Sequence, residues 1–183
     1  MKKKLAIFLA CVLLVGGIVG GTLAWLTDKT DPIVNTFTTS GIEIDLTETT
    51  GTEYKMVPGC TITKDPVVTV EGGSEACWLF VKLEKANDFG KFMTYAIADG
   101  WTLVEGQSNV YCRTVSANSV NQPFAVLKNN QVSVKDTVTK ADMKTLADSG
   151  NYPKLTVTAY ATQYYETNND PFAAKEAWAK IGA

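Results

Sequence analysis

Apolar and polar residues alternate along three segments, in the pattern of β-strands that bury one face. The segments are GIEIDLTE (41–48), CWLFVKLE (77–84) and LTVTAYATQYY (155–165). The predicted inward positions are Ile42, Ile44 and Leu46, then Cys77, Leu79, Val81 and Leu83, and finally Leu155, Val157, Ala159 and Ala161. On the outer face of the second segment, Trp78 and Phe80 precede Lys82 and Glu84. We therefore expect that face to begin covered and to end in water.

Shorter runs rich in β-branched and aromatic residues predict further strands. They are IVNTFTT (33–39), VVTVE (67–71), WTLVE (101–105) and NVYCRTV (109–115). The run FAVLKNNQVSV (124–134) reads as a hairpin, because Asn129 and Asn130 tolerate the positive φ values of a tight turn.

Two segments instead predict short helices. In TKADMKTLADSG (139–150), Thr139 is the expected N-cap with Asp142 three residues on, and Gly150 is the expected stop. In DPFAAKEAWAKIGA (170–183), Asp170 is the expected N-cap and Pro171 the first helical residue. Trp178 and Ile181 would dock this helix on the domain.

The order of these elements predicts a mainly β fold, an antiparallel jelly-roll-like β-sandwich with one or two short helices. No Pro-, Gly- or Ser-rich linker divides the chain, so residues 25–183 are expected to form a single domain. That length is sufficient for a substantial core.

The first 24 residues have the layout of a secretory signal peptide. Three lysines precede an apolar stretch over 5–19, and Thr22 and Ala24 supply small residues before a predicted cut after Ala24, which leaves Trp25 first. A retained transmembrane anchor over 5–26 is the alternative, since about 20 apolar residues span a bilayer. A lipoprotein signal at Cys11 fits poorly, because few apolar residues precede it. The chain would contact a membrane only before cleavage.

The amino-acid composition excludes several classes of function. Removing residues 1–24 leaves 14 basic and 19 acidic residues, a net charge of −5, which disfavours nucleic-acid binding. The chain has no histidine, which excludes Ser-His-Asp and Cys-His catalysis and His-Glu-x-x-His zinc sites. No acidic pair stands out for carboxylate catalysis. We expect no enzyme activity, cofactor or metal.

Three cysteines remain after cleavage, Cys60, Cys77 and Cys112, and none has Cys-x-x-Cys spacing. Because three is odd, at least one is unpaired or pairs between chains. Cys77 and Cys112 lie on apolar faces of predicted strands, either as small core residues or as a disulfide.

The sequence resembles the TasA/camelysin family of Gram-positive bacteria. The resemblance begins in GGTLAWLTD and NTFTTSGIEIDLTE, at Gly21, Thr22, Ala24, Trp25, Asp28, Asn35, Phe37 and Gly41. It continues in MVPGCTITKDPVVTV, at Pro58, Gly59, Lys64, Asp65 and Pro66. The segments SEACWLFVKLE and AYATQ with AAKEAWAKI resemble a clostridial branch of biofilm matrix pilins.

This resemblance implies a secreted jelly-roll subunit of extracellular matrix fibres, exported through a SipW-type signal peptidase. It also implies a homopolymer, with accessory matrix subunits as further partners. In such fibres the mature N-terminus, here residues 25–40, completes a sheet of the next subunit. Val34, Asn35, Phe37 and Gly41 would belong to this donor strand, with side chains such as Val34 or Phe37 in acceptor pockets. The alternative is an ordinary first strand of its own sandwich.

Other residues allow two readings. Lys64 is a candidate for an isopeptide crosslink or a solvated lysine at a strand edge. The aromatic residues either line a carbohydrate platform or pack in the core and across strands; they are Trp78, Phe80, Trp101, Tyr160, Tyr164 and Tyr165. A monomeric secreted or cell-surface module that binds glycan or a host surface is therefore the second functional hypothesis.

Overall fold

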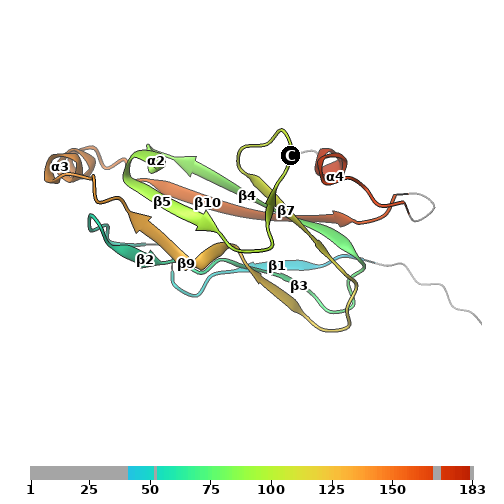
Figure 1. Cartoon of the computed structure of the whole chain (residues 1–183). Helices are drawn as coiled ribbons and strands as arrows, with labels where there is room; N and C mark the ends of the chain where they lie inside the picture. Colours follow the sequence, from blue (N-terminus) through green and yellow to red (C-terminus); the bar gives the residue numbers. More distant parts are fainter. Residues whose placement is uncertain (1–40, 52, 167–169, 182–183) are drawn as a thin grey trace, which may run out of the picture. The chain divides into compact units, whose positions relative to one another are not determined.

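The described part of the computed structural model, residues 41–51, 53–166 and 170–181, contains ten strands and three short helices (Figure 1). The strands are β1 (Ile44–Thr47), β2 (Thr61–Thr63), β3 (Val67–Val70), β4 (Cys77–Ala86), β5 (Met93–Ile97), β6 (Thr102–Leu103), β7 (Val110–Val115), β8 (Gln122–Ala125), β9 (Leu127–Val134) and β10 (Lys154–Gln163). The helices are α2 (Phe89–Phe92), α3 (Lys140–Ser149) and α4 (Ala174–Ile181). The mainly β prediction is confirmed.

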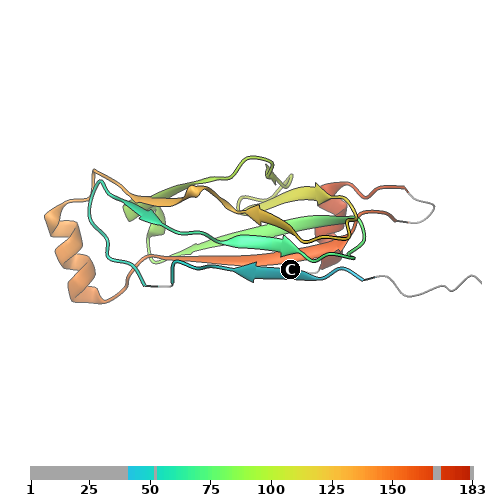
Figure 2. The same cartoon turned by 90° about the horizontal axis from the view of Figure 1, so that it is seen from below.

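The strands form two layers (Figure 2). One layer is the sheet β10-β4-β7-β6, and the other combines the sheets β1-β3-β8 and β2-β9-β5. Every pairing between these strands is antiparallel. The two smaller sheets are continuous along the chain, because only residues 64–66 separate β2 from β3 and only Val126 separates β8 from β9. Val126 bridges the junction by donating its N–H to the Pro66 carbonyl at 3.0 Å.

Apolar side chains between the two layers form the main core. The predicted inward residues of β4 all belong to it, and Cys77, Leu79, Val81 and Leu83 are at most 1% exposed. Their neighbours across the layer include Val68, Val70 and Leu127. The inner face that the alternating sequence predicts for β4 is therefore confirmed.

The outer face of β4 carries a second core under α4. Phe80 packs there with Trp178, whose ring centre lies 5.3 Å away, and Tyr160 packs edge-on against the same indole. Ile181 also packs against this cluster, so the predicted docking residues of α4 are confirmed. The predicted start of α4 is wrong. Pro171 instead forms a β-bridge with Tyr165, and the helix begins only at Ala174.

Helix α3 matches its prediction at both ends. Thr139 accepts a hydrogen bond from the Asp142 N–H, and the Asp142 side chain accepts one from the Thr139 N–H, which completes a capping box. Gly150 ends the helix at φ 67°, a conformation that glycine adopts at little cost. Leu146 packs the helix against Phe92 and Val134.

The predicted hairpin at Asn129 and Asn130 is wrong, although both residues have the expected positive φ, 55° and 53°. They lie inside β9, which pairs with β2 and β5, whereas β8 pairs with β3. Between the pairs Tyr95↔Val132 and Ile97↔Leu127 the register shifts, so β9 carries the extra residues as a bulge. The positive φ values serve this bulge.

The strand order supports a β-sandwich, but the jelly-roll winding is not confirmed. β1 pairs only with β3 in the described part of the chain, while the last strand, β10, pairs only with β4. β1 nevertheless lies beside β10, at the edge where the two layers meet. Among the described residues, neither β1 nor β10 has a strand partner on this side.

Candidate functional site

The outer edge of β10 is the longest strand edge that lacks a partner in the described part of the chain. β10 has ten residues, and each has a partner in β4, from Lys154↔Ala86 to Gln163↔Cys77. Lys154, at its start, is its one charged residue. Natural sheets usually protect such an edge with charges, prolines or short strands.

The hydrogen bonds on the two sides of β4, to β10 and to β7, identify which backbone groups of β10 point away from the sheet. Tyr164 donates to the Ala76 carbonyl, and Leu83 donates to the Asn109 carbonyl beside β7. Even-numbered residues of β10 therefore bond to β4, because the direction alternates along an antiparallel strand. The N–H and C=O groups that point away belong to Leu155, Val157, Ala159, Ala161 and Gln163. They have no hydrogen-bond partner among the described residues.

Side chains between the two layers are also less buried along this edge of β10. Leu155, Val157 and Ala159 face the main core but are only half-buried, whereas their neighbours on β4 are fully buried. Leu46 on β1 was predicted to be buried and is 37% exposed, so that prediction is wrong. Leu46 lies on the side of β1 that faces the unpaired edge of β10. An added strand there would cover apolar surface as well as satisfy backbone groups.

A cavity of about 300 Å³ opens at the start of this edge. Ile62 and Val132 come from one layer, Leu155 from the other, and Phe89 and Met93 close the end beside α2. Tyr54 and Lys64 form a polar wall. The cavity therefore has apolar surfaces on both layers and lies beside the outward-pointing N–H of Leu155.

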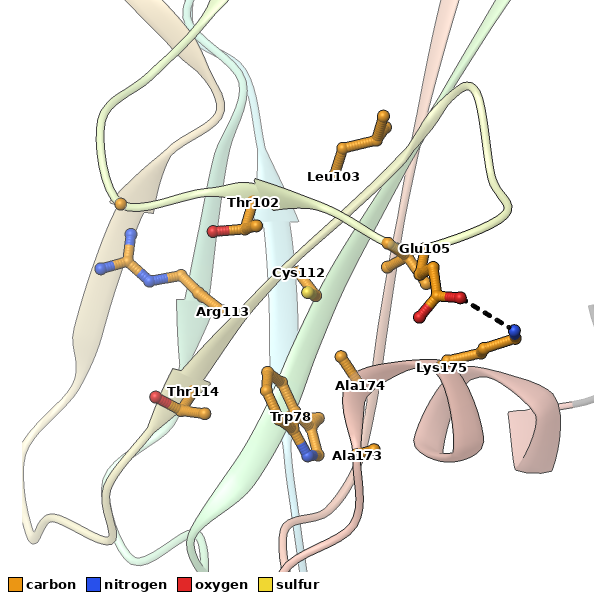
Figure 3. A pocket seen from close by; sticks show the side chains of 12 residues that line it. Trp78, Thr102, Leu103, Glu105, Cys112, Arg113, Thr114, Ala173, Ala174 and Lys175 are labelled. Atoms are coloured by element: carbon orange, nitrogen blue, oxygen red, sulfur yellow. Dashed lines mark hydrogen bonds and ion pairs between the residues drawn. The ribbon is translucent and has the colours of Figure 1, made fainter.

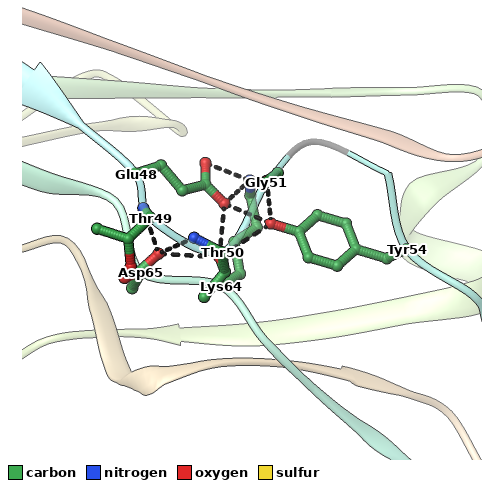
Figure 4. Close-up of polar contacts among 7 residues, drawn as sticks. All are labelled: Glu48, Thr49, Thr50, Gly51, Tyr54, Lys64 and Asp65. Atoms are coloured by element: carbon green, nitrogen blue, oxygen red, sulfur yellow. Dashed lines mark hydrogen bonds and ion pairs between the residues drawn. The ribbon is translucent and has the colours of Figure 1, made fainter.

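A network of polar contacts fixes Tyr54 and Lys64, the polar wall of the cavity (Figure 4). Lys64 Nζ lies 2.8 Å from both carboxylate oxygens of Glu48, and their side chains are 14% and 22% exposed. Tyr54 donates its hydroxyl to Glu48 Oε1 at 2.6 Å. Burial, followed by this hydrogen bond, raises the pKa of Tyr54. The network ties the loop after β1 to the junction between β2 and β3.

Asp65 anchors the same loop from the other side. Its carboxylate accepts hydrogen bonds from the N–H groups of Thr49 and Thr50, both at 3.0 Å, and from their hydroxyls. These bonds favour the ionised form, with the Thr49 hydroxyl contributing most, and lower the pKa of Asp65 to about 2. The loop beside the cavity is therefore fixed through a charged group.

The predicted signal and donor residues lie mostly outside the described residues. These are Thr22, Ala24 and Trp25 at the predicted cleavage site, and Val34, Asn35 and Phe37 in the predicted assembly strand. Gly41 is described and exposed. Its carbonyl accepts a hydrogen bond from Glu75, in the turn between β3 and β4, at 3.2 Å. The chain therefore enters the sandwich beside that turn.

Lys64 is not the solvated edge lysine of the second interpretation, because its ammonium is paired with Glu48 and largely buried. The isopeptide crosslink stays a prediction. Sequence reasoning missed Glu48 and Tyr54, which lie 16 and 10 positions away, because neither belongs to a recognisable motif.

The aromatic residues pack as core and cross-strand pairs, as the second of their two readings predicted. Trp78 donates its indole N–H to the Phe172 carbonyl at 2.9 Å and packs against Tyr164. Trp101 donates to the Ala125 carbonyl at 2.8 Å and lies in the main core. Tyr165, at 43%, is the clearly exposed member of the set. The six residues therefore do not share one surface, since Trp101 and Trp78 belong to different cores, and their packing favours the second reading.

The three described cysteines are free thiols, so the alternative of a Cys77–Cys112 disulfide is wrong and the small-core interpretation is confirmed. Cys77 faces the main core, and Cys112 faces the second core under α4. Cys60 is exposed in the turn before β2. Burial raises the pKa of Cys77 to about 11 and also raises that of Cys112.

Within residues 41–51, 53–166 and 170–181, no helix has the length and hydropathy to cross a membrane. The same residues include no group of three or more Cys, Asp or Glu side chains arranged to hold a metal ion. No family model matches the chain, and comparison with curated proteins and with solved structures finds no match. The family resemblance therefore rests on the sequence motifs alone.

Proposed function

We propose that this protein is a secreted structural subunit of extracellular biofilm matrix fibres. Its copies assemble by β-augmentation, in which the mature N-terminal segment of one copy, residues 25–40, adds a strand to the next copy. The observation that carries the proposal is the outer edge of β10, with its five residues of unpaired backbone. A SipW-type signal peptidase would release the mature chain, and accessory matrix subunits would be further partners.

Backbone hydrogen bonds at β10 would supply much of the affinity, as in other cases of strand addition. The segment IVNTFTT has β-branched and aromatic residues and no charge, which suits it to pairing with this edge. Because β10 lacks charges beyond Lys154, nothing on the edge itself repels such a strand.

The cavity beside Leu155 supports one choice of anchoring side chain. Val34 and Phe37 are three positions apart, so in a regular strand they face opposite sides and only one can enter the space between the layers. The cavity has apolar walls and a volume of about 300 Å³, which suits the phenyl ring of Phe37. Ile33 would share its face, and Val34 would lie on the side of α4.

Chain direction favours donation to a neighbouring copy. Gly41 lies beside the turn before β4, while α3 and the start of β10 lie at the far end of β4 (Figure 1). When copies stack end to end, a strand that leads into Gly41 of one copy runs antiparallel to β10 of the next. Phe37 is close to Gly41 in sequence. It would then lie at the start of β10 in the acceptor copy, where the cavity opens.

Replacing Phe37 by Asp tests the anchor. A carboxylate against the apolar walls of the cavity loses its hydration at a cost of several kcal/mol unless it is paired, and Lys64 in the polar wall is already paired with Glu48. We therefore expect fibres to be lost while thermal melting of the monomer is unchanged. Thr36→Asp is the matched control, because position 36 faces the opposite side, and its fibres should persist. Lowered melting of Phe37→Asp with fibres intact in electron micrographs would show that the strand belongs to its own domain.

Replacing Ala159 by Pro tests the acceptor edge directly. Proline removes an N–H that points away from β4 and is tolerated on edge strands, so the monomer should stay folded. Because a proline ring blocks the added strand, we expect fibre assembly to stop. Ala159→Ser keeps the N–H and should assemble. Fibres of normal appearance from folded Ala159→Pro would exclude β10 as the acceptor.

A further inference from the structure

The end of the sandwich where the chain enters at Gly41, here called the entry end, is acidic. Glu71 donates its N–H to the Glu43 carbonyl, which brings the turn after β3 beside the start of β1. Tyr164 donates to the Ala76 carbonyl, which brings the segment after β10 to the same place. Residues 41–44, 71–76, 116–121, 164–166 and 170–172 contain no lysine or arginine. Five carboxylates there form no ion pair with a described residue: Glu43, Glu71, Glu75, Glu166 and Asp170.

The opposite end, here called the α3 end, is rich in lysine (Figure 2). Lys140 is the first residue of α3, and Lys55 precedes Met56, which packs with Leu146 of that helix. The ten residues of β4 separate the two ends by about 30 Å. The lysines without an ion pair to a described residue are Lys55, Lys85, Lys135, Lys140 and Lys154, and the corresponding acids are fewer, namely Glu53, Asp88 and Asp136.

Each end also exposes an apolar side chain among these charges. Val120, in the loop between β7 and β8 at the entry end, is 61% exposed. Tyr152 is 53% exposed at the α3 end, where its carbonyl accepts a hydrogen bond from Asn87. Apolar side chains surrounded by polar and charged ones are typical of protein–protein contacts.

The loop that carries Val120 is held in a fixed position. Gly73 donates its N–H to the Asn118 carbonyl at 2.7 Å, which joins the turn after β3 to this loop. A Cβ on Gly72 would lie 2.5 Å from the Ser119 carbonyl oxygen, so the two backbones touch with no side chain between them. The acidic groups of the turn and the apolar tip of the loop therefore form one preformed surface.

A second copy of this chain fits that surface. If strand donation is as proposed above, the entry end of the donor faces the α3 end of the acceptor. The net charge of −5 on residues 25–183 makes two copies repel each other, whereas carboxylates facing lysines attract. We propose that the entry end of one copy docks on the α3 end of the next through carboxylate–lysine contacts around Val120 and Tyr152. This docking would orient the copies head to tail while the strand is inserted.

Charge reversal at one end tests the docking on the mature chain. Glu71→Lys with Glu75→Lys makes the entry end basic like the α3 end, and Lys55→Glu with Lys140→Glu makes the α3 end acidic like the entry end. By light scattering, each double variant alone should form fibres at least about ten-fold more slowly than the wild-type chain. An equal mixture of the two should regain the wild-type rate to within about two-fold, because opposite charges then meet at every joint.

Two exposed ion pairs on the sides of the sandwich supply charge-matched controls. Asp99 lies 3.4 Å from Lys128, and Glu105 lies 3.2 Å from Lys175 beside the cavity between β6 and α4 (Figure 3). Asp99→Lys with Glu105→Lys matches the first variant in net charge, and Lys128→Glu with Lys175→Glu matches the second. Exposed pairs contribute little to stability, so both controls should stay folded and form fibres at close to the wild-type rate.

Crosslinking of wild-type fibres gives a readout that does not depend on how the variants fold. A carbodiimide joins a carboxylate to an amine in contact with it, and mass spectrometry should find Glu71 or Glu75 linked to Lys55 or Lys140. Because the two ends of one copy are far apart, such a link must join two copies. Wild-type fibres without a link between the ends, reversal variants as fast as their controls, or a mixture no faster than its components would overturn the docking and leave strand donation standing. A wild-type chain that forms no fibres would overturn both proposals.

Discussion

Cys77 and Cys112 stand on neighbouring strands, yet their thiols lie in different cores. In the pairing of β4 with β7, Cys77 is opposite Val115 and Cys112 is opposite Phe80. The two cysteines are thus three positions apart along the sheet and project from opposite faces. Geometry, rather than redox conditions, keeps them apart, since a disulfide needs the two Cβ atoms within about 4.5 Å of each other.

We predict that Cys60 alone among these three thiols reacts quickly with a thiol reagent in the native protein. Cys77 and Cys112 are buried with raised pKa values, and the thiolate is the reactive form, so they should label only as the protein unfolds. Counting labels by mass spectrometry measures this. Cys60→Ser should lose the fast phase, and fast labelling that persists in this variant would contradict the prediction.

Asp65 should make stability depend on pH in acid. Its folded pKa of about 2 is below the unfolded value, so its contribution is complete above about pH 4 and is lost as pH falls toward 2. Asp65→Asn should lower the urea midpoint at pH 7 and flatten its decline between these pH values. Asp142, also at a pKa of about 2, contributes to the slope that remains in this variant.

Asp45→Asn is the matched control for that experiment. Asp45 is exposed on β1, and no hydrogen bond or ion pair to its side chain occurs among the described residues. Its substitution should leave the pH profile unchanged. If Asp65→Asn and Asp45→Asn give the same profile, the bonds from Thr49 and Thr50 do not stabilise the fold.

The burial of single residues could be predicted where the two-residue period of the sequence continues through a buried strand. The inner face of β4 followed from strict alternation, and the capping box of α3 from Thr139 and Asp142. Leu46 did not follow the same rule, because its exposure depends on what lies across the open edge and not on its neighbours in sequence. Glu48 and Lys64 escaped prediction for the same reason, since only the fold brings them together.

At the scale of elements, the bulge in β9 sets two adjacent asparagines in different surroundings. Asn130 has a buried Oδ1 without a partner among the described residues, while Asn129 is exposed. Both have positive φ, which glycine adopts freely. Asn130→Gly should therefore stabilise the protein by about 1 kcal/mol, because it removes an unsatisfied buried carbonyl. Urea unfolding measures this.

Asn129→Gly is the control for the bulge. It has the same backbone conformation but a solvated side chain, so its effect should be within about 0.5 kcal/mol of zero. Loss of stability in Asn130→Gly, or equal effects of the two substitutions, would mean that the buried amide contributes more than the bonds it lacks.

Elements were harder to predict where a strand is short or bent. β2 has three residues, too few to show a sustained period of two, and the bulge interrupts the alternation along β9. The asparagine pair was correctly assigned positive φ but was placed in a hairpin, because sequence does not distinguish a turn from a bulge. α2 has four residues, too few for a helical pattern to appear.

At the scale of the whole assembly, strand direction distinguishes donation from self-completion. A strand donated by the preceding copy would run antiparallel to β10, whereas a chain's own segment, ending at its own Gly41, would run parallel to it. Thr36→Cys with Thr156→Cys, in a Cys60→Ser background, should therefore form disulfides between chains. A non-reducing gel would show a ladder of multimers.

The reciprocal pair is Thr36→Cys with Thr162→Cys, at the other end of β10. It should give little crosslinking if donation is correct. An efficient crosslink within single chains of this pair, without a ladder, would mean that the segment completes its own sandwich. Both outcomes are read from the same gel.

The entry of the chain at Gly41, at the end of the sandwich remote from α3, has a mechanical consequence for such a fibre. Tension along the stack would pull each donated strand parallel to β10, so the hydrogen bonds of all five outward residues would be loaded in shear at once. A sideways force would instead open them one after another. The joints between subunits should therefore resist stretching far better than peeling, and a fibre under flow would bend before it breaks.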